Sequence, residues 1–96
     1  MIVCAAIKVC FERNGKTVEA VIPGFRHSDC WELMSTLGLP PKGERQEVEG
    51  FIDRTGAFLD RYQAFEHAMQ CDQLSDTTRV SKAERGEREL FSEDLY

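Results

Sequence analysis

Residues 2–25, IVCAAIKVCFERNGKTVEAVIPGF, decide the fold of this chain. Asn14-Gly15 divides the stretch in two, and this dipeptide is the strongest short-range signal for a two-residue turn between antiparallel strands. If Arg13 pairs with Lys16, the apolar residues of the two arms meet on one face of the hairpin. The pairs on that face are Phe11 with Val18, Val9 with Ala20, and Ile7 with Ile22. The sequence therefore predicts two antiparallel strands with one buried face.

A short helix is expected after this hairpin, over about 29–37. Ser28 or Asp29 suits the N-cap, and the Asp29 to Glu32 spacing is typical of a capping box. Gly38 is a good residue to end the helix, and the two prolines that follow forbid its continuation.

A second, shorter hairpin is expected in the middle of the chain. Residues 47–52 have the composition of a strand, residues 53–56 begin with Asp and end with Gly as turns do, and residues 57–59 form a short return strand. Asp60 then caps a helix over about 61–72 whose apolar residues recur at helical spacing.

Together these elements predict an α+β fold: a small antiparallel sheet, made of the N-terminal hairpin and the second short hairpin, packed with two short helices. Residues 1–74 are expected to form this core domain. Residues 75–96 are mostly polar and mixed in charge before an apolar end, so they predict a C-terminal extended arm. That arm is expected to dock either on its own sheet or on a neighbouring subunit.

Composition narrows the functional classes. Ninety-six residues with a net charge of −5 make one small acidic domain, which argues against binding to a nucleic-acid polymer. A few arginines can still create a local pocket for one small anion. No apolar run is long enough to span a membrane, and the start lacks the features of a signal peptide. The four cysteines are therefore expected to be reduced thiols in a cytosol.

Arg26 and His27 lie where the second strand passes into the first helix. The free N–H groups and the dipole at a helix N-terminus favour anions, and a guanidinium suits phosphate or carboxylate. The alternative is a surface arginine beside a histidine that merely closes the loop by hydrogen bonds.

Arg61 is the second candidate. It shares a helical stripe with the apolar positions of its helix, and it lies in the first turn, where a cation is disfavoured. Such local conflicts often mark functional sites, although a salt bridge to Asp53 or Asp60 explains this one equally well. Phe51 and Phe58 flank the neighbouring turn and suit stacking on a base, but both also suit a hydrophobic core.

Metal and cofactor chemistry find no support in the cysteine and histidine spacings, which match no zinc module. The His27–Cys30 and His67–Cys71 pairs suggest a nucleophile with its base, but no third orienting residue or oxyanion feature accompanies either pair. The sequence therefore predicts a protein without cofactor or metal that is not an enzyme.

Three segments also carry a resemblance to a known family. They are residues 5–8 with 24–29 (AAIK and GFRHSD), residues 50–61 with Ala64 (GFIDRTGAFLDR), and residues 90–96 (LFSEDLY). They resemble small proteins of bacteriophages and prophages, and among these the Thoeris anti-defence sponges of the first type. Members of that family sequester cyclic ADP-ribose-type immune signals, some are described as also binding cyclic oligonucleotides, and they are not known as hydrolases.

The resemblance implies a homo-oligomer, dimer or higher, with pockets between protomers. The ligand-binding residues that it implies are Arg26, His27, Phe51, Asp53, Phe58 and Arg61. The expected function is then a phage protein of the host cytoplasm that binds and sequesters a small, anionic, nucleotide-derived immune signal without cleaving it. The alternatives are an inhibitor that binds a host defence protein through its acidic loop 43–49 or its tail 93–96, and a small enzyme.

Overall fold

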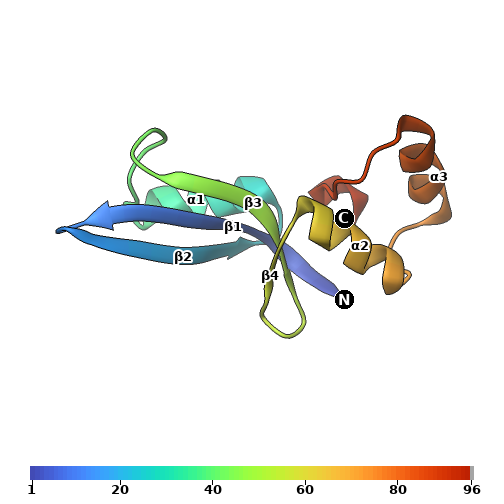
Figure 1. Ribbon diagram of the computed structural model, residues 1–96, viewed down its shortest axis with the longest axis horizontal. Helices are drawn as coiled ribbons and strands as arrows, with labels where there is room; N and C mark the ends of the chain where they lie inside the picture. Colours follow the sequence, from blue (N-terminus) through green and yellow to red (C-terminus); the bar gives the residue numbers. More distant parts are fainter. Residues whose placement is uncertain (96) are drawn as a thin grey trace.

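The structure is a computed structural model that describes residues 1–95. It contains one antiparallel sheet with the strand order β2-β1-β3-β4, three α-helices and a short 3-10 helix (Figure 1). In chain order the elements are β1 (Ile2–Arg13), β2 (Lys16–Gly24), α1 (His27–Thr36), β3 (Gln46–Asp53), β4 (Phe58–Asp60), α2 (Arg61–Gln70), α3 (Asp76–Arg85) and η1 (Ser92–Asp94). The predicted α+β class, with a small antiparallel sheet built from two hairpins, is confirmed.

The N-terminal hairpin has the register that the sequence predicts. Arg13 pairs with Lys16, and the three apolar pairs follow in order along β1 and β2. The turn residues Asn14 and Gly15 both have positive φ angles, 53° and 75°. This left-handed backbone at both central positions is what a tight turn between twisted strands requires, and Asn and Gly adopt it at the lowest cost.

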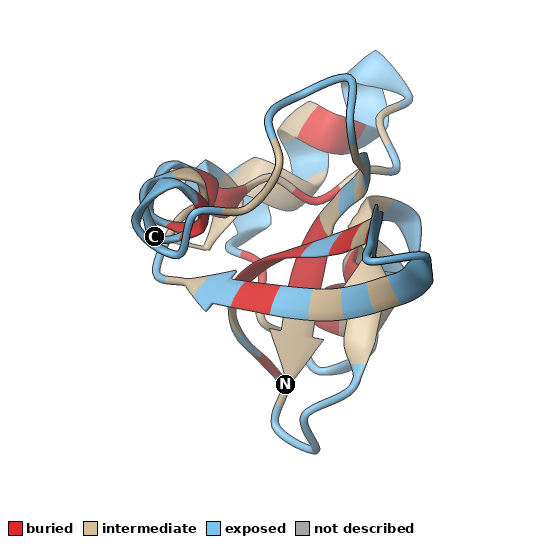
Figure 2. Cartoon of the chain, turned by 90° about the vertical axis from the view of Figure 1, so that its left-hand side faces the viewer, coloured by how far each residue is buried: buried red, intermediate tan, exposed pale blue. Residues whose placement is uncertain are grey.

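The two faces of the sheet differ in what covers them. Exposed residues alternate along β2 with buried or half-buried ones (Figure 2), and the buried and half-buried ones belong to the face that carries α1 and α2. On the other face only the β4 end is covered, and most side chains there are exposed. We call this side the open face; its central residues are Lys8, Cys10, Glu19, Val21, Gln46 and Val48.

Gly50 lets β4 approach β3 closely. A Cβ atom at this position would lie 2.1 Å from the carbonyl oxygen of Leu59 and 2.6 Å from the ring of Phe58. Because Gly50 has no side chain, the Phe58 ring covers it on the open side of the sheet, beyond the central residues of the open face.

Helix α1 begins two residues earlier than predicted, because its N-cap is Arg26 rather than Ser28 or Asp29. The carboxylate of Asp29 accepts a hydrogen bond from the backbone N–H of Arg26 at 2.9 Å. Asp29 thus caps the helix from its third position. The predicted end is correct: Gly38 has φ 70°, and the next residue closes the last turn by donating to the Met34 carbonyl at 3.2 Å.

Helix α2 begins as predicted, with Asp60 as its N-cap. The Asp60 carboxylate accepts from the Gln63 N–H at 2.8 Å, and the Gln63 side chain accepts from the Asp60 N–H at 3.0 Å. This reciprocal pair fixes the direction in which α2 leaves the sheet edge, and so it fixes the place of Arg61.

The expectation of an extended C-terminal arm is wrong for residues 76–85, which form α3. Ser75 caps this helix through its hydroxyl, and Gly86 ends it with φ 65°. The mixed charges of the stretch do not mark an arm: most of them lie on the exposed side of an amphipathic helix, whereas Lys82 is 1% exposed. None of the helices in residues 1–95 is long and apolar enough to cross a membrane.

The segment after α3 returns to the body of the same chain. Leu90 is fully buried, and its N–H donates to the carbonyl of Arg61 at 3.0 Å. Ser92 is buried as well, against α1. The predicted tail 93–96 begins within η1, and its last residue, Tyr96, lies outside the described residues.

Candidate functional site

His27 is the centre of the polar cluster beneath the sheet. Its Nε2 lies 2.8 Å from the carbonyl of Gly50, and its Nδ1 lies 2.7 Å from the hydroxyl of Ser92. A carbonyl only accepts, so Nε2 carries the proton, and Nδ1 accepts from the serine hydroxyl. The Phe51 ring meets the imidazole edge to face, with 5.1 Å between centroids. We call this group, together with Arg61, the His27 cluster.

The surroundings of His27 keep it neutral. Burial lowers its pKa below the usual 6.5, and the nearby Arg61 charge acts in the same direction. The hydrogen bond to Gly50 and the charge of Glu49 oppose these effects without reversing them. A serine, an imidazole and a carbonyl in line resemble a nucleophile with its base, but the first two are 6% and 9% exposed. In this arrangement a substrate has no access to them.

Arg61 lies beside this histidine, and two of its guanidinium nitrogens are hydrogen-bonded within the chain. One guanidinium nitrogen donates to the carbonyl of Leu90 at 2.7 Å, and another pairs with the carboxylate of Glu49 at 3.1 Å. The guanidinium also lies over the ring of Phe91, 4.7 Å from its centroid. The salt bridge that the sequence offered as an alternative is therefore present, but Glu49 on β3 replaces Asp53 or Asp60 as the partner.

The other predicted site residues lie elsewhere. The guanidinium of Arg26 is 6.0 Å from the ring of Phe25, at the start of α1. Asp53 accepts hydrogen bonds from Thr55 and Ala57 within its own turn, which lowers the pKa of its carboxyl. Phe58 covers Gly50 on the open side of the sheet. The structure thus brings together His27, Phe51 and Arg61, but not Asp53 or Phe58.

Lys82 and the C-terminal segment are the parts of this region that sequence reasoning missed. The Lys82 ammonium pairs with Asp94 at 2.8 Å and donates to the Glu89 carbonyl at 2.8 Å. It also lies 5.0 Å from the centroid of the Phe91 ring, which Arg61 contacts as well. One signal was available: a Ser cap and a Gly stop enclose residues 76–85, and they predict a helix with an inward side.

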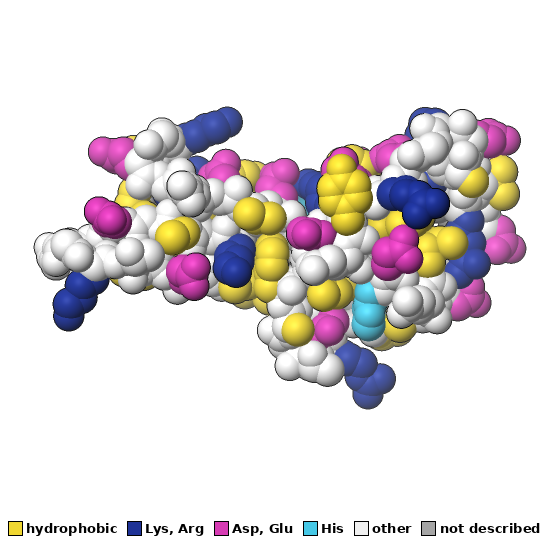
Figure 3. Space-filling view, viewed as in Figure 1, with side chains coloured by type: hydrophobic (Ala, Val, Ile, Leu, Met, Phe, Trp, Pro, Cys, Tyr) yellow, Lys and Arg dark blue, Asp and Glu magenta, His cyan; other side chains and the backbone are white. Residues whose placement is uncertain are grey.

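A hollow lies between α2 and α3, with a volume of about 390 Å³. Phe65, Met69 and Ala83 give it an apolar lining, and basic side chains border it, as the space-filling view of this end shows (Figure 3). We call it the α2–α3 hollow. Its charged residues are Arg79, Lys82 and Arg88, with Glu66 and Glu87.

The cations of this hollow differ in how many of their hydrogen-bond donors are paired within the chain. Arg88 is 78% exposed, and its closest carboxylate, Glu66, is 3.9 Å away. Arg79 pairs with Asp72 at 2.5 Å, but its Nε is buried without a hydrogen-bond partner among the described residues. The exposed guanidinium of Arg88 therefore gives this end of the protein hydrogen-bonding capacity for an anion, whereas the Arg61 guanidinium of the His27 cluster already donates to Leu90 and Glu49.

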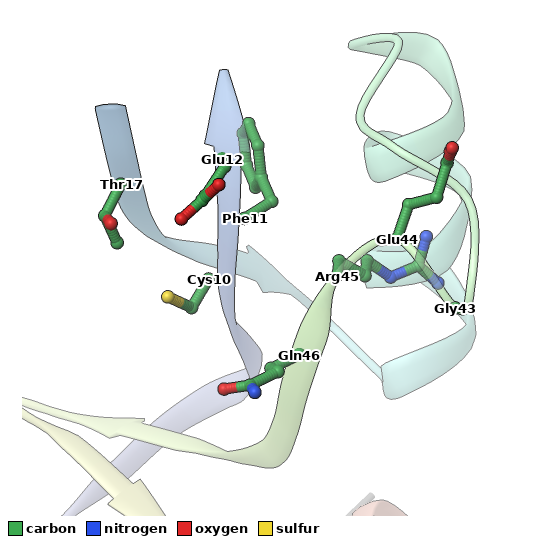
Figure 4. Close-up of a pocket in the computed structure, with 8 residues that line it drawn as sticks. All are labelled: Cys10, Phe11, Glu12, Thr17, Gly43, Glu44, Arg45 and Gln46. Atoms are coloured by element: carbon green, nitrogen blue, oxygen red, sulfur yellow. The ribbon is translucent and has the colours of Figure 1, made fainter. Parts of the chain in front are cut away.

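A second hollow, of about 450 Å³, opens between the tip of the first hairpin and the loop before β3 (Figure 4). Arg45 is the only cation in its lining, and it is already engaged by Glu47, by the Pro40 carbonyl and by the Trp31 ring. The exposed acids Glu12 and Glu44 make this site unsuitable for an anion.

The thiols and imidazoles outside this region form no evident metal centre. No group of three or more His, Cys, Asp or Glu side chains in residues 1–95 is arranged to hold a metal ion. Burial raises the pKa of the Cys30 thiol to about 11, which leaves it protonated and inert. Cys71 is 3.7 Å from the Nε2 of His67, but that nitrogen is also 2.7 Å from the nitrogen of Met1.

One comparison with known proteins gives a match. A family model described as "Phage T4 y16D protein" matches residues 1–96 of the chain. No curated protein and no solved structure matches it.

Proposed function

Since the chain belongs to the phage T4 y16D protein family, we propose that it is a phage protein that binds and holds a small, anionic, nucleotide-like ligand without cleaving it. The resemblance to anti-defence sponges suggests the ligand class, a cyclic ADP-ribose-like or cyclic oligonucleotide signal in the host cytoplasm. The α2–α3 hollow supplies the site in this proposal. The observation that carries it is an apolar lining bordered by cations that are not fully paired.

The lining suits the two halves of a nucleotide. Phe65 and Met69 offer an aromatic ring and a polarisable thioether, on which a purine or a pyrimidine base can pack. Arg88 and Arg79 border the same hollow and offer N–H donors to phosphate oxygens. Lys82 contributes little to this site, because its ammonium is paired with Asp94 and Glu87 and donates to the Glu89 carbonyl.

The His27 cluster is a poorer site for the same ligand. A phosphate at Arg61 would have to displace the Leu90 carbonyl and the Glu49 carboxylate, both of which already accept from the guanidinium. Leu90 would leave a fully buried position in that exchange, which costs about 2–3 kcal/mol in lost burial alone. The binding role that the resemblance assigns to Arg61 is therefore moved in our proposal to Arg88 and Arg79.

Calorimetric titration with cyclic ADP-ribose isomers and cyclic dinucleotides tests this function. We expect saturable binding, and the ligand should be recovered with unchanged mass after the protein is denatured. Arg88→Ala should weaken binding by about tenfold to a hundredfold, because a hydrogen bond to a charged group contributes about 1.5–3 kcal/mol.

Arg54→Ala, at an exposed position in the turn between β3 and β4, is the matched control and should leave the affinity unchanged. Absence of binding by all these nucleotides, or equal losses in the two variants, would contradict the proposal. A ligand recovered as fragments would show turnover instead.

A second candidate function is direct inhibition of a host defence protein. The hollow of Figure 4 favours it, since Glu12 and Glu44 are exposed there while Arg45 is neutralised by Glu47. Such an acidic hollow fits a basic segment of a partner. The double variant Glu12→Lys/Glu44→Lys should abolish capture of that partner without affecting nucleotide binding. Unchanged capture by this variant would reject the acidic hollow as the contact.

A further inference from the structure

The open face of the sheet has a regular pattern of apolar and charged side chains. Lys8 on β1 lies between Val21 on β2 and Val48 on β3, and these two valines are 40% and 48% exposed. In the next row along the strands, Cys10 lies between Glu19 and Gln46. Figure 3, in which α1 lies behind the sheet, shows hydrophobic side chains near the middle of this face with charged ones beside them.

The charges of these two rows take part in no ion pair with the residues that the structure describes. Among residues 1–95, neither Lys8 nor Glu19 takes part in an ion pair, whereas the lysine and arginine side chains on the helical side are largely paired. A shallow hollow of about 390 Å³ lies over the same rows and is bordered by Lys8, Glu19 and Val48. These two rows therefore combine unburied apolar area with one unpaired charge of each sign.

We propose that a second copy of this chain packs on the open face, sheet against sheet, with Lys8 of each protomer beside the partner's Glu19. Antiparallel sheets pack in this way at a separation of about 10 Å, with their strands nearly aligned. A two-fold axis in the interface, perpendicular to β1 and passing between Lys8 and Cys10, places the first row of one sheet over the second row of the other. The lysine then lies over Cys10 of the partner subunit, one strand away from the partner's Glu19.

The occupant is a second copy because the pattern is complementary to itself. A two-fold interface uses the same patch twice, so each attractive contact between unlike residues is formed twice. Two Lys8–Glu19 pairs form in the dimer, and Val21 and Val48 of each copy lose water against the facing rows. The same packing makes a sandwich with helices on both outer sides, a common arrangement for a sheet with one exposed face.

This inference is independent of the proposed function, because the open face and the α2–α3 hollow share no residue. Sedimentation equilibrium or mass photometry over a range of protein concentrations tests it. The wild-type chain should sediment as a dimer. Val48→Arg, which puts a second cation beside Lys8, should raise the dimer dissociation constant at least about tenfold.

Val80→Arg is the matched control. Val80 on α3 is 57% exposed and distant in sequence from the sheet, so the same substitution there should leave the dimer intact. Far-UV circular dichroism of both variants should match the wild type, since both positions are exposed.

Exchanging the charges of Lys8 and Glu19 tests whether these two residues pair across the proposed interface. Lys8→Glu and Glu19→Lys should each weaken the dimer, and the double variant should restore it, because the exchanged charges again face one another. A wild-type chain that stays monomeric at all concentrations would overturn the proposal. So would a dimer that Val48→Arg leaves intact, or a double variant no tighter than the two single ones.

Discussion

At the scale of single residues, His27 is predicted to bind a ligand but has a structural role in the folded chain. The sequence places it beside a helix N-terminus, where an anion site and a loop-closing histidine are both reasonable. In the structure both ring nitrogens are used, by Gly50 and Ser92, and the ring packs on Phe51. These hydrogen bonds join α1, β3 and the C-terminal segment, and they depend on a neutral imidazole.

The first prediction follows from that neutral state. The folded pKa of His27 is lowered by burial, so the unfolded chain takes up a proton at a higher pH than the folded one. The contribution of His27 to stability is complete above about pH 6.5, the unfolded pKa, and is lost as the pH falls toward the folded pKa. We expect the free energy of unfolding, measured by urea denaturation, to decrease between pH 7.5 and pH 5.5.

The variant His27→Gln is the control for this pH dependence. Its amide can still donate to Gly50, but it does not titrate, so its stability should change less over the same interval. A decrease as steep as that of the wild type would assign the pH dependence to other groups.

At the scale of elements, α3 is where the sequence interpretation was least complete. Its polar composition predicts an arm, although Ser75 and Gly86 are typical start and stop residues of a helix. The helix is fixed largely through Lys82, which connects it to Asp94 and to the Glu89 carbonyl. A buried lysine is rare unless it is paired, so the partners decide whether this helix packs at all.

Replacement of that lysine is the second prediction. Lys82→Met keeps most of the side-chain volume but leaves Asp94, 13% exposed, without its cation. Breaking a buried pair in this way costs about 3–5 kcal/mol. Hydrogen exchange should show faster exchange in α3 and in residues 90–95, whereas the hairpin of β1 and β2 remains protected.

Lys42→Met, at an exposed loop position, is the matched control and should leave the exchange pattern unchanged. Uniformly faster exchange over the whole sheet in Lys82→Met would mean that α3 is not a separable unit.

At the scale of the whole molecule, the chain is elongated. Its radius of gyration is 14.6 Å and its extents are 48 × 26 × 20 Å, whereas a compact domain of this length has a radius of about 12–13 Å. The hairpin tip forms one end and α3 the other (Figure 1). The C-terminal segment connects the α3 end to the sheet, and Leu90 is its fully buried contact.

The third prediction concerns this connection. Leu90→Ala should lower the free energy of unfolding by about 2–5 kcal/mol, because it removes a large apolar side chain from a packed site. Leu37→Ala, at a 56% exposed position, should change it by less than about 0.5 kcal/mol. If Leu90→Ala and Leu37→Ala shifted the denaturation midpoint equally, the segment would not be packed as described.

Deleting residues 90–96 should destabilise the fold as well. Loss of partner binding by that deletion variant therefore would not identify these residues as a partner-binding tail.

Most of the fold is predictable from the sequence because its signals are local. The Asn14-Gly15 turn fixes the hairpin register, Asp60 fixes the start of α2, and Gly38 fixes the end of α1. Each signal acts within a few residues, through a backbone angle or a cap, and needs nothing from the rest of the chain. The α+β class follows from these signals together with the alternation of apolar residues.

Only the tertiary structure decided which partners the charged and polar side chains have. Arg61 meets Glu49, which is 12 residues away, and Ser92 meets His27, which is 65 residues away. No local pattern records which distant group will satisfy a buried donor, since that depends on how the chain brings its ends together. Because His27 and Arg61 pack against the C-terminal segment, the expected ligand site became a structural cluster, and our proposals place binding on other surfaces of the protein.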